Sequence, residues 1–267
     1  MRISNLSTDP IHEFEFLNAG RKPNDFYVDR LPVLHGQVDE LPDELEALVF
    51  CADLQGREVS GPQAHDPLRL IGENIPLALA PVLETLNVRS RQQAGVVLAG
   101  DFYTYPDLRG RGGTGDVTAV WKSFSTFRWV LGVAGNHDTF GEQKEPPKCD
   151  TSYFLDAGRC VVDGIQFAGL SGVIGSPHKN FRRNQHDYLE NLELLFSEPT
   201  DIGVLHEGPN GDTGKYPGLI EIRNVLESCP PCLLVRGHKH WPEPMIELAN
   251  GTQVLNVECT IVVLTKE

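Results

Sequence analysis

Gly135-Asn136-His137-Asp138 directly follows the apolar stretch Trp129-Val130-Leu131-Gly132-Val133-Ala134, and this junction decides the fold. The apolar stretch is typical of a buried strand. An amide and an imidazole, both of which can bind a metal ion, stand at its end. Polar turns after strands are common in loops, so this junction alone does not indicate a metal site. The other strand ends of the chain decide the question.

Four further predicted strands end in residues of the same kinds. Asp53 and Gln55 follow residues 48–50, Asp101 follows 96–98, His206 follows 202–205, and His238 and His240 follow 233–235. Each residue alone has a plainer explanation, since an aspartate at a strand end often caps the next helix and a histidine is often a packing residue. Five such strand ends in one chain favour a shared metal centre over five separate coincidences.

This set, in this order, resembles the calcineurin-like metallophosphoesterase superfamily, whose motifs read D-x-H, G-D, G-N-H-D/E, H and G-H-x-H. The resemblance covers roughly residues 46–242. It implies an α/β fold in which two mixed β-sheets form a sandwich flanked by helices. The pattern of elements alone leaves a doubly wound sheet as an equal alternative. One position departs from the family, because Gln55 stands where histidine is usual.

The resemblance also implies a dinuclear metal centre. Site one takes Asp53, Gln55, Asp101 and His240, and site two takes Asp101, Asn136, His206 and His238. Two divalent ions about 3.5–4 Å apart can neutralise a phosphate ester and hold an activated water for in-line attack. These ligand types suit Mn, Fe, Zn, Ni or Mg, and the amide of Gln55 favours manganese or magnesium at site one. The alternative is that water or another side chain, such as His65, completes that site.

His137 is implied to be the general acid, beside the metal ligands without being one of them. Histidine suits proton transfer because its side chain titrates near neutral pH. Asp138 is one candidate to orient it. The related protein Ser/Thr phosphatases carry an aspartate shortly after the G-D motif, and Thr104 occupies that position, which weakens a protein phosphatase interpretation.

The predicted activity is hydrolysis of a phosphate mono- or diester in a small phosphorylated compound. Two alternatives stay open: a nuclease or nucleotide phosphodiesterase on the same fold, and a non-catalytic metal-binding scaffold. The formal net charge of −14 repels nucleic-acid polymers and anionic membranes. Metal charge can still attract a small phosphate. The loop Arg109–Gly113 and the basic residues His178, Lys179, Arg182 and Arg183 are candidate phosphate contacts.

The chain is predicted to be cytoplasmic, because no apolar stretch approaches the ~20 residues that span a bilayer and the first residues lack a signal peptide's apolar centre. Its six cysteines are expected to be free thiols. Cys229-Pro230-Pro231-Cys232 is interpreted as a proline-stiffened turn rather than a redox or zinc site. The oligomeric state stays open.

Residues 1–45 are predicted to be an irregular N-terminal extension, with room for a short strand or hairpin, because prolines punctuate them. Residues 46–267 are predicted to form one metallophosphoesterase domain. Strands are expected near 47–53, 95–100, 129–134, 202–206 and 232–237, and helices near 65–87, 116–127, 185–197 and 217–228. The first of these helices should break at Pro76 or Pro81.

Overall fold

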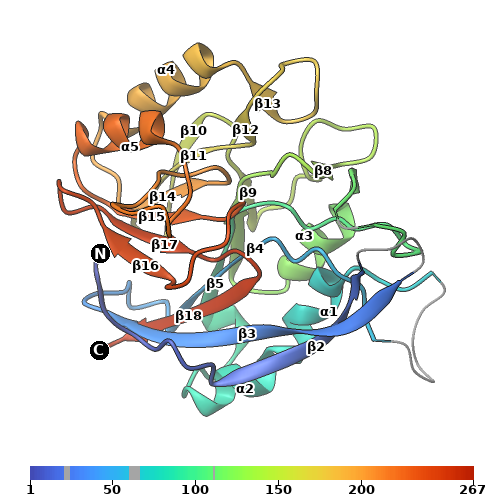
Figure 1. The fold of residues 1–267 in the computed structure, drawn as a ribbon. Helices are drawn as coiled ribbons and strands as arrows, with labels where there is room; N and C mark the ends of the chain where they lie inside the picture. The colour runs from blue at the N-terminus through green and yellow to red at the C-terminus, as the bar shows by residue number, and fades with distance from the viewer. Residues whose placement is uncertain (21–24, 60–66, 111) are drawn as a thin grey trace.

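Two β-sheets face each other at the centre of the molecule, and helices cover the outer face of each (Figure 1). This computed structural model describes residues 1–20, 25–59, 67–110 and 112–267. The predicted fold class, a helix-flanked sandwich of two mixed sheets, is confirmed.

The first sheet runs in the order β1-β3-β18-β4-β5-β7-β9, with β2 paired to β3. These strands are β1 (Ile3–Leu6), β2 (His12–Ala19), β3 (Phe26–Val38), β4 (Ala47–Ala52), β5 (Ala94–Leu98), β7 (Trp129–Gly132), β9 (Ser152–Phe154) and β18 (Thr260–Lys266). Strands β4, β5, β7 and β9 are parallel, so their carboxyl ends lie along one edge. Strand β18 lies between β3 and β4, in the middle of this sheet.

The second sheet runs in the order β10-β11-β14-β15-β17-β16. Its strands are β10 (Gly158–Val162), β11 (Ile165–Leu170), β14 (Ile202–Leu205), β15 (Leu233–Arg236), β16 (Met245–Glu247) and β17 (Gln253–Asn256). The four inner strands β11, β14, β15 and β17 are parallel, and the two edge strands are antiparallel to their neighbours. Two small pairs lie outside the sheets, β6 (Gly115–Asp116) with β8 (Asp138–Thr139) and β12 (Val173–Ile174) with β13 (Arg182–Arg183).

Successive side chains of a strand point to opposite faces of the sheet, so one strand contributes to two separate hydrophobic cores. In β4, Leu48 and Phe50 pack between the two sheets, whereas Val49 and Cys51 pack under the helices of the first sheet. Those helices are α1 (Ile71–Ala78), α2 (Ala80–Thr85) and α3 (Thr118–Phe124), with the 3-10 turn η1 (Arg91–Gln93) beside them. Helices α4 (Gln185–Phe196) and α5 (Ile220–Glu227) cover the second sheet. Strands β4, β5, β7, β14 and β15 are therefore buried on both faces, which fixes the positions of their ends.

The N-terminal region is the clearest departure from the sequence prediction. Residues 1–45 are not an irregular extension, since they include β1, β2 and β3, and β3 pairs with β18 inside the first sheet. Pro32 is tolerated within β3 because the pairing with β18 begins only at Val33, so that contact does not need the missing N–H. The partner strand lies at the other end of the chain, and local sequence patterns do not reveal such a partner.

The predicted break in the first helical stretch and the predicted state of the cysteines agree with the structure. The helical stretch breaks at Leu79, between α1, which contains Pro76, and α2, which begins beside Pro81. All six cysteines are free thiols. Within the described part of the chain, no helix combines the length and the apolar character that crossing a membrane requires.

Candidate metal centre

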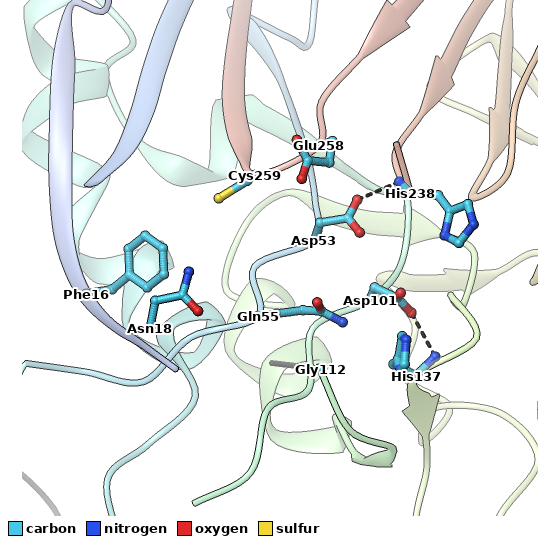
Figure 2. Close-up of a pocket in the computed structure, with 10 residues that line it drawn as sticks. All are labelled: Phe16, Asn18, Asp53, Gln55, Asp101, Gly112, His137, His238, Glu258 and Cys259. Atoms are coloured by element: carbon cyan, nitrogen blue, oxygen red, sulfur yellow. Dashed lines mark hydrogen bonds between the residues drawn. The ribbon is translucent and has the colours of Figure 1, made fainter. Parts of the chain in front are cut away.

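Strand ends from both sheets converge on one rim of the sandwich. Asp53 and Gln55 follow β4, Asp101 follows β5, Asn136 and His137 follow β7, His206 follows β14, and His238 and His240 follow β15. Figure 2 shows five of these residues around one cavity of about 270 Å³, namely Asp53, Gln55, Asp101, His137 and His238. The rim thus brings most of the predicted site residues together.

The most compact group consists of Asp101, His206 and His238, whose ligand atoms lie within 4.8 Å of one another. His206 is fully buried, and its Nδ1 lies 2.8 Å from the carbonyl oxygen of Ala99. Because a carbonyl only accepts, Nδ1 donates to it, and Nε2 is the nitrogen that faces the site. This Nε2 lies 3.1 Å from Oδ2 of Asp101. A histidine held in this way is oriented as a metal ligand usually is.

The backbone is bent sharply at three of the site residues. Asp53, Asp101 and His238 have φ angles of 55°, 61° and 72°, in the left-handed region that non-glycine residues seldom adopt. Such conformations persist only where the surrounding structure enforces them, and they concentrate at functional sites. Here the flanking strands, buried on both faces, supply that enforcement.

Two glycines of the motifs are required by close approach. A Cβ at Gly135 would lie 2.0 Å from Oδ1 of Asp101, and a Cβ at Gly237 would lie 2.3 Å from Oδ2 of Asp53. Any side chain at either position would push a carboxylate out of the site. The glycines of G-N-H-D and G-H-K-H therefore make room for the aspartates of two other motifs.

Asp138 links two of the motif loops. Its side chain is fully buried and accepts hydrogen bonds from the backbone N–H groups of Asp101, Phe102 and Gly135, at 2.7, 2.8 and 2.8 Å. Burial, reinforced by the nearby Asp101 carboxylate, raises the pKa of Asp138 to about 6. Its oxygens are occupied by the backbone, so the suggestion that Asp138 orients the ring of His137 is wrong.

His137 contacts Asp101 through its backbone, not through its ring. Its backbone N–H donates to Oδ1 of Asp101 at 2.8 Å, as Figure 2 shows. The ring lines the cavity, and its Nδ1 is buried without a hydrogen-bond partner. The ring is therefore free to interact with a substrate in the cavity.

The ionisable groups of the site shift one another's pKa values. Burial, together with the carboxylates of Asp101 and Glu258, raises the pKa of Asp53 to about 8. Burial disfavours a charged His206, but the neighbouring Asp101 outweighs that effect and raises the pKa of His206. Burial and the proximity of His206 lower the pKa of His238 to about 3. Such an arrangement of buried carboxylates and neutral imidazole favours a cation in their midst.

The family model for the calcineurin-like phosphoesterases matches residues 47–242, which contain all the strand ends described above. The chain belongs to the calcineurin-like phosphoesterase family. A protein of Thermus thermophilus, TT1561, has a similar fold, with a TM-score of 0.52 and 15% identity over 79% of this chain and 88% of that one. At this identity the likeness shows the fold alone. A comparison with curated protein sequences gave no significant match.

Three buried polar atoms among the predicted ligands have no hydrogen-bond partner: Nε2 of Gln55, Oδ1 of Asn136 and Nε2 of His206. Buried polar atoms are nearly always satisfied, so the oxygen of Asn136 and the ring nitrogen of His206 fit a bound cation, whereas the amide nitrogen of Gln55 is a donor. The two ends of an amide are assigned only from hydrogen bonds, and the opposite orientation of Gln55 puts its carbonyl oxygen in the place of the nitrogen. The residue that departs from the family motif can therefore still offer an oxygen. The alternative ligand His65 lies outside the described residues.

His240 is placed differently from the other predicted ligands. Of its side-chain surface, 81% is exposed, and its Nδ1 lies 3.0 Å from Oε2 of Glu258. The ring does not line the cavity that Asp53 and Gln55 line. The structure therefore brings the other predicted residues to the site and leaves His240 at its outer edge.

Several residues at the site carried no motif in the sequence. Glu258 and Cys259 follow β17 and line the cavity, and so do Phe16 and Asn18 of β2. Glu207, next to His206, lies with Oε1 3.9 Å from Nε2 of His238. Glu258 had one detectable signal, because it stands just after a β-branched and apolar stretch as the motif residues do. Phe16 and Asn18 had none, because their strand was not predicted.

One arginine from each basic candidate for phosphate contact has another partner in the structure. Arg109 packs over the ring of Tyr105, 4.2 Å from its centroid, and Arg183 pairs with Asp156. From the loop at 109–113, Gly112 lines the cavity. Arg111 lies outside the described residues.

Proposed function

We propose that the protein is a dinuclear, metal-dependent phosphoesterase that hydrolyses a mono- or diester of a small phosphorylated compound. The convergence of Asp101, His206 and His238 within 4.8 Å, at a cavity shared with Asp53 and His137, carries this proposal. When bound, two divalent ions, manganese being favoured, would neutralise the ester and supply an activated water.

The residues of the chain have distinct tasks in this proposal. Asp101 can serve both metal sites, because Oδ1 accepts from the backbone of His137 while Oδ2 faces His206. Asp53 is held at the opposite side by the backbone N–H of His238, which donates to its Oδ2 at 2.8 Å. The unpartnered ring of His137 is the group that can protonate the leaving oxygen of a substrate.

Size and charge support a small substrate. The cavity of about 270 Å³ is large enough for a phosphate with a short organic group. The net charge of −14 opposes the binding of a nucleic-acid polymer. A nucleotide phosphodiesterase would use the same metal centre, and a diester substrate distinguishes it from a monoesterase.

The proposal is tested by metal analysis and by turnover of p-nitrophenyl phosphate against bis(p-nitrophenyl) phosphate. We expect two divalent ions per chain and hydrolysis of at least one ester. Removal of metal with a chelator should abolish the hydrolysis, and added manganese should restore it. A protein that binds metal but turns over neither ester at any metal loading would instead support the scaffold alternative.

Replacing His137 should lower the rate without changing the metal content. His137→Ala keeps the backbone N–H that donates to Asp101, so the ligand geometry should persist. We expect kcat to fall by ~10²–10⁴, the usual contribution of a general acid. His186→Ala, at an exposed position of α4, is the matched control. Loss of bound metal from His137→Ala would make His137 a ligand.

A further inference from the structure

The cavity wall contains a carboxylate that belongs to none of the family motifs. Glu258 lies in the turn between β17 and β18 and lines the same cavity as Asp53, Gln55 and Asp101. Figure 2 shows its side chain beside Asp53, on the side of the cavity away from His137. A third carboxylate there changes the ligands that the metal centre can offer.

The fold brings Glu258 to this rim in the same way as it brings the motif residues. Strand β17 is parallel to β15 and adjacent to it, so the two strands end at the same edge. Glu258 then forms a bridge with Ala52, and the N–H of Cys259 donates to the carbonyl oxygen of Ala52 at 3.2 Å. Ala52 immediately precedes Asp53. Backbone contacts therefore hold residue 258 next to residue 53.

His240 lies on the solvent side of this carboxylate. Only 24% of the Glu258 side-chain surface is exposed, against 81% for His240, and Nδ1 of His240 lies 3.0 Å from Oε2 of Glu258. Since a carboxylate only accepts, the ring donates from Nδ1. The imidazole therefore contacts the carboxylate, and the carboxylate contacts the cavity.

The amide of Gln55 lines the same cavity, and its Nε2 is buried without a hydrogen-bond partner. In the opposite amide orientation the carbonyl oxygen takes that place and can face a cation. Asp53, Asp101 and Glu258 place three carboxyl groups around one cavity. Of the two buried arginines near the site, Arg57 donates to the carbonyl oxygens of Leu68 and Thr104, and Arg236 packs against Trp241. Neither lines the cavity.

We propose that Glu258 is a ligand of metal site one and that His240 is a positioning residue that holds Glu258 in place. This assignment rests on the proposed function, and it gives Glu258 the ligand role that the family motif gives to His240. Site one would then offer oxygen alone, from Asp53, Gln55, Asp101 and Glu258. Site two would keep the two imidazoles of His206 and His238. An all-oxygen site prefers hard ions such as Mg²⁺ and Mn²⁺ to Zn²⁺.

The test is a titration of metal-free protein with Mn²⁺, followed by calorimetry and by direct metal analysis. Loss of a residue that only supports a ligand lowers metal affinity by roughly 10–100-fold. Glu258→Gln should lower the Mn²⁺ affinity of one of the two sites by more than that. His240→Ala should fall within that smaller range. His240→Asn should bind nearly as the wild type does, because its amide N–H can replace Nδ1 but cannot replace a ligating Nε2.

The matched control is Glu190→Gln, which removes one carboxylate from an exposed position of α4. Circular dichroism checks that each variant is folded. The proposal is overturned if Glu258→Gln binds two Mn²⁺ with wild-type affinity. It is also overturned if His240→Asn loses a site as completely as Glu258→Gln does. If the wild type itself binds two ions and hydrolyses esters, either result leaves the proposed function intact.

Discussion

Asp101→Asn should leave a folded protein that has lost metal from at least one site and hydrolyses phosphate esters no faster than the assay background. The variant is expected to fold because asparagine has the shape of aspartate. Its carbonyl oxygen can accept from the backbone of His137, and its amide can donate to the lone pair on Nε2 of His206. The replacement removes the negative charge and one of the two oxygens, and a residue that binds two cations requires both oxygens.

Metal analysis, ester turnover and the midpoint of thermal unfolding should be measured together for this variant. The three results separate a lost ligand from a lost fold. Asp150→Asn, at an exposed position, is the control for removing one negative charge. If the Asp101→Asn protein keeps both metals and full activity, the assignment of Asp101 as the shared ligand is wrong.

Asp138→Ala should cause the largest loss of stability among single replacements near the site. It leaves three buried backbone N–H groups without an acceptor, those of Asp101, Phe102 and Gly135. Each such group costs about 1–3 kcal/mol, so the free energy of unfolding should fall by roughly 3–6 kcal/mol if some water enters the space. Because domains are stable by only about 5–15 kcal/mol, this variant should lie close to unfolding.

Denaturant unfolding of Asp138→Ala and Asp138→Asn tests this expectation. Asparagine keeps one oxygen, which can serve the N–H groups of Asp101 and Gly135, and places an amide against that of Phe102. Its loss should be intermediate. Equal stability of wild type and Asp138→Ala would show that these hydrogen bonds do not hold the two loops together.

The sequence predicts the family and the fold well because the signals that carry them are local. A strand of buried residues followed by a glycine and a ligand type is visible within a few residues, as in Val96–Asp101 or Leu233–His238. Parallel strands then gather these ends without further information. The family match and the sandwich of two sheets confirm the interpretation at that level.

The features that the sequence does not reveal depend on distant partners. Strands β1–β3 are stabilised by a sheet whose central strand is β18, so their prolines suggest irregular structure. Glu258 acquires its position from the bridge to Ala52, which no spacing predicts. In the sequence, Asp138 suggests a partner for the adjacent histidine, but in the structure its oxygens accept hydrogen bonds from three backbone N–H groups instead.

The central place of β18 has a consequence for how the molecule is built. Residues 260–266 separate β3 from β4, two strands that are neighbours in the chain but not in the sheet. During synthesis, β3 cannot be joined to β4, the strand that leads to Asp53, until residues 260–266 have emerged and can pair with both. Contacts between such distant segments slow folding. The part of the cavity wall that Phe16 and Asn18 of β2 supply is therefore expected to close after the motif loops that follow β4, β5 and β7 have formed.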